Sequence, residues 1–321
     1  MFFDDIDLNH LYSQVSIGCC SSMDFIEEQE KKMKDFNTVL VAVDGSAMAM
    51  EALKRAISIA KKKDAQLIVV HVIEPPFVES PLLQPVDKEV IKKEIAEKIE
   101  KLDAEADLTY VLFVESGLAV NNIITKIEKT KADLLVIGSH GKDDVSSTYF
   151  GSTALKLVHN THIPVLIVKN EANDNYQKIL APTNLSDYSK ESILFANTLF
   201  NDASIKYLYA HESVDEVQAL RYHISLEELH KFKSELFSDA KTALEKFVKE
   251  VAEGEMELIN FHSSINEDIL SYLTADKADL LVLGSKGVNN LNSFLFGSTA
   301  SYLIQRSPSD VLAYVPAKKQ D

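Results

Sequence analysis

The sequence predicts an α/β protein made of two tandem, doubly wound domains, each with a five-stranded parallel sheet flanked by helices. Short, continuous apolar runs alternate along the chain with segments of helical periodicity, as in a parallel sheet covered on both faces. The whole order of runs occurs twice. The chain has 321 residues, of which 46% are apolar, so it has enough material for two packed domains.

The duplication is clearest near the end of each copy. The stretch KADLLVIGS at 131–139 returns as KADLLVLGS at 277–285, and each is followed by FGSTA at the same distance. Further back, TVLVAVDGS at 38–46 pairs with KILAPTNLS at 178–186 at a slightly shorter offset. The second copy therefore holds a few extra residues in its middle.

Continuous runs of Val, Ile and Leu predict the strands of the first copy. A parallel strand that is buried on both faces gives such a run, whereas a half-buried strand would alternate with polar residues. Polar residues or glycine bound each run. The strands are expected, in chain order, at 37–43, 65–72, 108–115, 133–138 and 164–169.

Helices are predicted between these strands, where apolar residues recur every three or four positions. The first helix is capped by Ser46, a residue type favoured at helix N-termini. The second is rich in Lys and Glu at the spacing of i,i+4 ion pairs. Helices are expected at 46–63, 87–106, 120–130 and 152–160, and the second copy repeats the order.

Flanking and connecting segments complete the predicted domain organisation. Residues 1–36 lie outside the repeat and are expected to form an N-terminal tail. The first domain covers 37–169, here called the first repeat, and a polar linker covers 170–177. The second domain, the second repeat, covers 178–316, and 317–321 form a C-terminal tail.

Composition and charge exclude several classes of function. The formal net charge of −16 argues against nucleic acid and anionic membranes as partners, because both need a basic face. Cys19 and Cys20 are adjacent, and no Cys or His cluster has metal-ligand spacing, so no metal site is predicted. The N-terminus has no signal-peptide pattern and no run is long enough to span a membrane, so we expect a cytoplasmic protein.

Both copies carry the same glycine-rich stretch after their fourth strand. In the first copy Gly138 ends the strand, Gly141 follows in the loop, and Gly151 opens the next helix. Glycines let the backbone approach a ligand, and a helix start offers free N–H groups and the positive end of a dipole. The hydroxyls of Ser152 and Thr153 add donors there, so the stretch predicts a phosphate cradle at the carboxyl edge of the sheet.

The spacing G-x2-G-x9-G-[ST], together with the VAVDGS start and the IPVLIVK end, resembles the ATP-binding signature of universal stress proteins. The resemblance covers both repeats. It implies a tandem member, similar to a dimer of single-domain proteins fused in one chain, whose last strands pair across the repeats to form an internal pseudo-dimer. Rival nucleotide-binding families fit poorly, because the chain has no Walker loop and no GxGxxG after its first strand.

The resemblance implies an ATP site in the first repeat. Asp44, at the end of the first strand, would contact the nucleoside, and Val72 would pack beside adenine. Asp143 and Asp144 add negative charge to the phosphate loop, which leaves open weaker binding or the recruitment of Mg²⁺. The implied nucleotide-binding residues are Asp44, Val72, Gly138, Ser139, Gly141, Gly151, Ser152 and Thr153.

The second repeat keeps the glycines but changes the nucleoside side. Asn184 replaces the acid, and Glu212 stands where Val72 stands in the first repeat. A carboxylate beside an adenine face costs desolvation unless it is paired, whereas Asn184 can still hydrogen-bond a ribose. A second nucleotide site is left open at Asn184, Gly284, Ser285, Gly287, Gly297, Ser298 and Thr299.

Two functions follow from these patterns. The first is an ATP-binding stress-response regulator whose nucleotide occupancy changes its interaction with a regulatory protein partner. The alternative is a nucleotide-independent interaction scaffold with degenerate sites. No arginine and no obvious base for activating water lie in either glycine loop, so no catalytic residue is predicted and at most slow ATP hydrolysis is expected. A homodimer of the tandem chain is also left open.

Overall fold

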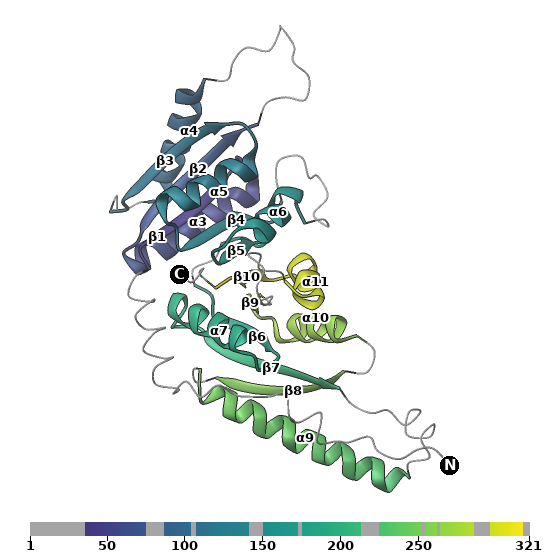
Figure 1. Cartoon of the computed structure of the whole chain (residues 1–321). Coiled ribbons are helices and arrows are strands. Elements are labelled where there is room, and N and C mark those ends of the chain that lie inside the picture. Colours follow the sequence, from purple (N-terminus) through teal and green to yellow (C-terminus); the bar gives the residue numbers. More distant parts are fainter. Residues whose placement is uncertain are drawn as a thin grey trace, which may run out of the picture. The chain divides into compact units, whose positions relative to one another are not determined.

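The structure, a computed structural model, shows two successive copies of one strand–helix pattern (Figure 1). It describes residues 36–74, 87–103, 107–140, 150–172, 175–212, 225–251, 254–261, 264–285 and 296–316. None of the helices in these ranges is long and apolar enough to cross a membrane.

Every element predicted for the first repeat is present. Its strands β1, β2, β3, β4 and β5 span Thr38–Val43, Gln66–Ile73, Tyr110–Ser116, Leu134–Gly138 and Val165–Val168. Its helices α3, α4, α5 and α6 span Ala47–Lys63, Lys88–Leu102, Ala119–Thr130 and Ser152–Asn160. Helix α4 ends earlier than predicted because the carboxylate of Asp103 turns to the Lys61 ammonium, at 2.7 Å, and accepts the N–H of Leu108.

The second repeat follows the same order. Its strands β6, β7, β8, β9 and β10 span Lys178–Thr183, Ser204–Glu212, Glu255–Phe261, Leu280–Gly284 and Asp310–Tyr314. Its helices α7, α9, α10 and α11 span Asp187–Leu199, Leu226–Val248, Ile265–Asp276 and Ser298–Arg306. The extra length of this repeat shows in α9, which has 23 residues where the corresponding helix α4 has 15.

One continuous ten-stranded sheet runs through both repeats, in the order β3-β2-β1-β4-β5-β10-β9-β6-β7-β8. Strands within a repeat are parallel, and the two repeats join where β5 and β10 pair antiparallel, with Leu166 opposite Leu312. This pairing confirms the internal pseudo-dimer. It also removes two apolar strand edges that would otherwise be free to pair with other chains.

Helices cover both faces of the sheet. The apolar side chains of α3, α4, α7 and α9 form one layer with the strands, and those of α5, α6, α10 and α11 form the other. Central strand residues such as Leu40, Leu135 and Leu312 are fully buried between these layers. Burial on both faces explains why the strands read as continuous apolar runs in the sequence.

The segment predicted as a linker packs against both repeats at Tyr176. This side chain is 3% exposed and packs edge-to-face on Phe200, with ring centroids 4.9 Å apart. The Arg55 guanidinium of α3 lies 4.0 Å from the Tyr176 ring centroid. The Tyr176 hydroxyl donates to Asp310 Oδ2 at 2.6 Å, so one buried chain of contacts joins the first helix of the first repeat to the last strand of the second.

Lys169, directly after β5, forms another contact between the repeats. Its Nζ donates to the main-chain oxygens of Ile304, at 2.8 Å, and Ser307, at 2.9 Å, where α11 ends. A cation suits this position because a helix C-terminus carries partial negative charge. Burial nevertheless lowers the pKa of Lys169 to about 8.

Candidate functional site

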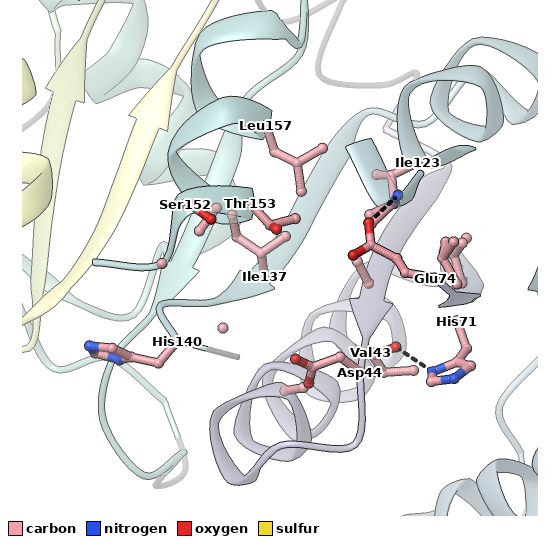
Figure 2. Close-up of a pocket in the computed structure, with 18 of the residues that line it drawn as sticks. Val43, Asp44, His71, Glu74, Ile123, Ile137, His140, Ser152, Thr153 and Leu157 are labelled. Atoms are coloured by element: carbon pink, nitrogen blue, oxygen red, sulfur yellow. Dashed lines mark hydrogen bonds between the residues drawn. The ribbon is translucent and has the colours of Figure 1, made fainter. Parts of the chain in front are cut away.

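A pocket of about 620 Å³ opens at the carboxyl ends of the strands in the first repeat (Figure 2). Strands β1 and β4 are neighbours there, but the helices that follow them, α3 and α6, pack on opposite faces of the sheet. Open α/β sheets bind ligands at such a point, because the diverging chain leaves a crevice. The volume is within the usual range for small-molecule sites.

The pocket brings together nearly all of the nucleotide-binding residues predicted from the sequence. Its lining includes Asp44, Val72, Gly138, Ser139, Gly151, Ser152 and Thr153. Gly141, Asp143 and Asp144 lie outside the described residues. The side chains of Asp44, Ser152 and Thr153 come from two different elements and border the same opening in Figure 2.

Three helices begin at the rim of this pocket, and they differ in how their N-termini are satisfied. Helix α3 is capped by Ser46, whose hydroxyl accepts the N–H of Ala49 at 3.1 Å. Helix α5 is capped from outside by Glu74, whose Oε1 accepts the N–H of Ala119 at 2.8 Å. Helix α6 begins at Gly151, and no side chain within the described ranges caps it. The first N–H groups of α6 are therefore the ones available to an anionic ligand.

Asp44 presents a carboxylate to the pocket at the end of β1. Its Oδ1 accepts the N–H of Ser46 at 2.8 Å, which fixes the side chain beside the start of α3. Its Oδ2 has no hydrogen-bond partner among the residues that the structure describes. A fixed carboxylate with one open oxygen is suited to accept a hydrogen bond from a ligand hydroxyl.

Two histidines near the pocket have structural partners. His71 Nδ1 lies 2.7 Å from the main-chain oxygen of Val43, which can only accept, so Nδ1 carries the proton and the ring braces the end of β1. His140 Nδ1 lies 2.7 Å from the hydroxyl of Ser139, a fully buried residue. These bonds favour a role in positioning the strand ends over a catalytic role.

In both repeats, close packing against a helix explains why the fourth strand ends in glycine. A Cβ on Gly138 would lie 2.8 Å from the main-chain carbon of Met48, in the first turn of α3. A Cβ on Gly284 would lie 2.8 Å from the main-chain oxygen of Tyr188, in the first turn of α7. Close approach of helix and strand therefore requires glycine at these two positions, whatever the loops bind.

The second repeat differs at the position of Asp44. Asn184 follows β6, but its Oδ1 accepts three hydrogen bonds at the start of α7, from the N–H and hydroxyl of Ser186 and the hydroxyl of Ser189. The acceptor oxygen is thus used within the fold. Helix α11 begins at Gly297 without a side-chain cap, as α6 does at Gly151.

Other predicted residues of the second repeat are placed only in part. Ser285 is 2% exposed, and its hydroxyl has no partner among the described residues. Ser298 and Thr299 open α11. Gly287 and the side chain of Glu212 lie outside what the structure describes.

Sequence reasoning missed Glu74, which also lines the pocket. It lies two residues beyond Val72, just past the end of β2. Its spacing was a usable signal, because alternate residues along a strand face the same side. What the sequence could not supply was its partner, the N–H of Ala119, which lies 45 residues further along the chain.

Comparison with known proteins gives a consistent result for both repeats. The sequence profile of the Universal stress protein family matches residues 35–169 and 175–315. A universal stress protein of Methanocaldococcus jannaschii is 34% identical over 140 residues, which are 42% of this chain and 82% of that protein. One from Thermus aquaticus is 37% identical over 139 residues, which are 42% of this chain and 99% of that protein.

A solved structure shares the fold across both repeats. The crystal structure of a putative universal stress protein from Pseudomonas aeruginosa covers 88% of this chain and 94% of its own, with a TM-score of 0.65. Its sequence identity is 17%, so the likeness concerns the fold alone.

Proposed function

The chain belongs to the universal stress protein family, as a tandem member, and we propose that it is a stress-response regulator that binds ATP or a close adenine analogue in the pocket of its first repeat. One observation carries this proposal. The pocket combines an uncapped helix N-terminus at α6 with an open carboxylate oxygen on Asp44 and an apolar wall at Val72. These three features suit phosphate, sugar and base in turn.

A comparison of the three helix N-termini at the pocket supports the proposed position of the phosphates. The N-termini of α3 and α5 are already capped, by Ser46 and Glu74, so they offer little to an anion. Helix α6 offers its first N–H groups, the positive end of its dipole and the exposed hydroxyls of Ser152 and Thr153. A chain of phosphates is therefore expected to point toward α6.

The nucleoside end is supported by the groups across the pocket. Asp44 Oδ2 can accept a hydrogen bond from a ribose hydroxyl. Val70, Val72 and Ile123 supply an apolar wall of the kind against which a base packs. Because the sheet fixes these residues, the site needs little rearrangement to take its ligand.

We propose that the second repeat does not bind nucleotide in the same way. A ribose hydroxyl that approached Asn184 would compete with the hydroxyls of Ser186 and Ser189, both 2.6 Å from its Oδ1. The amide nitrogen of Asn184 can still donate to a ribose oxygen, but a ribose O–H finds no open acceptor on this side chain. The two repeats therefore have different roles. The first binds nucleotide, and the second has a structural or partner-binding role.

The pocket is better suited to binding than to hydrolysis. Its described lining contains no Lys or Arg that could neutralise charge on a leaving phosphate. We therefore propose a regulator whose occupied and empty forms differ in their affinity for a protein partner. The cytoplasmic location stays a prediction, as does slow turnover with Mg²⁺.

A direct test is to purify the chain, denature it and identify any nucleotide that is released. Calorimetry on the nucleotide-free protein, with and without Mg²⁺, then measures ATP affinity. We expect ATP to bind. No released nucleotide and no heat of binding would instead support the alternative function, an interaction scaffold with degenerate sites.

A further inference from the structure

We propose that Glu74 selects the base, by accepting a hydrogen bond from an exocyclic amine and so favouring adenine over a base with a carbonyl at that place. The inference rests on the proposed function, because it assigns a specificity-determining residue within the same pocket. Glu74 is an exposed residue whose side chain is held by one hydrogen bond, from the N–H of Ala119.

Strand geometry places Glu74 at the base side of the pocket. Val70, Val72 and Glu74 are alternate residues along and just beyond β2, so they face the same side of the sheet. Val72 packs with the layer that contains α5 and α6, and Glu74 reaches the first residue of α5 (Figure 2). A base that packs against Val72 therefore has its edge close to the Glu74 carboxylate.

The carboxylate is held by one oxygen and keeps the other available. Leu118, the N-cap residue of α5, makes no side-chain cap, and Glu74 Oε1 takes that place by accepting the N–H of Ala119 at 2.8 Å. Glu74 Oε2 accepts no hydrogen bond from the described part of the chain. The held side chain loses little conformational freedom when a ligand arrives, which makes its single open acceptor selective.

Hydrogen-bond chemistry then separates the bases. An ionised carboxylate only accepts. Adenine offers a 6-amino donor, whereas hypoxanthine places a carbonyl oxygen at that position, and its nearest donor is the N1–H of the neighbouring ring atom. Guanine pairs best with a carboxylate through two parallel bonds, and at Glu74 the N–H of Ala119 would compete with one of them at Oε1. A single amine donor is thus the best match.

The test compares ATP with ITP, which differ at this position of the base, by calorimetry on the full chain. We expect the wild-type protein to bind ATP about tenfold more tightly than ITP, as for a hydrogen bond to a charged group. Equal affinity for the two nucleotides would overturn the proposal without any variant. Failure to bind either nucleotide would overturn the proposed function as well.

Glu74→Gln isolates the selective oxygen. Glutamine keeps an oxygen for the Ala119 N–H and presents an amide donor to the pocket in place of Oε2. We expect ATP affinity to fall about tenfold and ITP affinity to rise, so that the preference disappears or reverses. An unchanged ATP-to-ITP ratio in a normally folded variant would show that Glu74 only caps α5.

Asp87→Asn is the matched control. Asp87 caps α4 by accepting the N–H of Glu89 at 2.9 Å, and it does not belong to the pocket lining. The variant makes the same change from carboxylate to amide at a helix N-terminus. We expect its ATP-to-ITP ratio to equal that of the wild type, and thermal unfolding of both variants checks that they fold.

Discussion

The two repeats share a backbone plan but use the residue after their first strand differently. In the first repeat, one carboxylate oxygen of Asp44 accepts a hydrogen bond from Ser46, and the other faces the pocket. In the second repeat, the only acceptor atom of the Asn184 side chain, Oδ1, accepts hydrogen bonds from Ser186 and Ser189. The comparison teaches that the glycine ending the fourth strand serves helix packing in both repeats, and we propose that a few side-chain hydrogen bonds decide which strand ends hold a ligand.

The contacts across the join between the repeats have also diverged. Phe36 and Tyr176 each lie just ahead of the first strand of a repeat, and each packs on the first helix of the other. Phe36 meets Phe195 with ring centroids 6.3 Å apart, whereas Tyr176 meets the cation of Arg55 at 4.0 Å. A fused chain can place different residues on the two sides of its pseudo-twofold axis, which a symmetric dimer cannot.

The largest effect on stability is expected from removing Asp310, which accepts hydrogen bonds where the two repeats meet. Asp310 is 1% exposed and accepts hydrogen bonds from the Tyr176 hydroxyl and from the N–H of Lys169 and of Asn170. Asp310→Ala leaves the buried Tyr176 hydroxyl and the half-buried main-chain N–H of Lys169 without their acceptor, so we expect the free energy of unfolding to fall by about 3 kcal/mol in urea titrations. Asp202→Asn, which removes the exposed ion pair of Asp202 with Lys62, should change little. Similar losses in the two variants would refute the buried network.

Exchanging the residues that follow the first strand of each repeat tests the comparison between the repeats. Asp44→Asn gives the first repeat the side chain of the second, and its oxygen should turn to Ser46 and leave only a donor for the ligand. We expect ATP affinity to fall about tenfold, equivalent to ~1.4 kcal/mol, in calorimetric titrations. Asn184→Asp should leave that affinity unchanged. An Asp44→Asn variant with full affinity would show that the carboxylate does not bind the nucleoside.

Another effect is expected from Lys169 and builds up gradually across the alkaline pH range. Burial lowers the pKa of Lys169 to about 8 from its ordinary value of 10.5. Between these values the unfolded chain holds more protons than the folded one, so stability should rise with pH, by at most about 1.4 kcal/mol per unit. Lys169→Met should lack this rise when unfolding is followed from pH 8 to 10. Higher pH is avoided because burial raises the pKa of Tyr176, and loss of its proton then favours unfolding.

Much of the fold could be predicted because it depends on local patterns. Apolar runs marked the strands, and Ser46 marked the start of α3, where its hydroxyl does cap the helix. The pairing of β5 with β10 was implied by the family resemblance rather than by any local signal. The early end of α4 was missed because it depends on Lys61, a residue of another helix.

Residues of the candidate site were predictable only where their position along the chain, at the end of a strand or the start of a helix, marks them. Asp44 and Gly151 stand at strand and helix ends that the periodicity located. Contacts between residues far apart in the chain were not predictable, either at the pocket or at the join between the repeats. Glu74 reaches Ala119 across 45 positions and Tyr176 reaches Asp310 across 134, and neither spacing is a motif.

The number of nucleotides bound per chain tests the central claim most directly. Native mass spectrometry of the full chain, titrated with ATP, would count them without any variant. Because Asp44 keeps an open acceptor and Asn184 does not, we predict one nucleotide per chain at saturation. Two equivalent nucleotides per chain would contradict the difference between the repeats, and none would contradict the site itself.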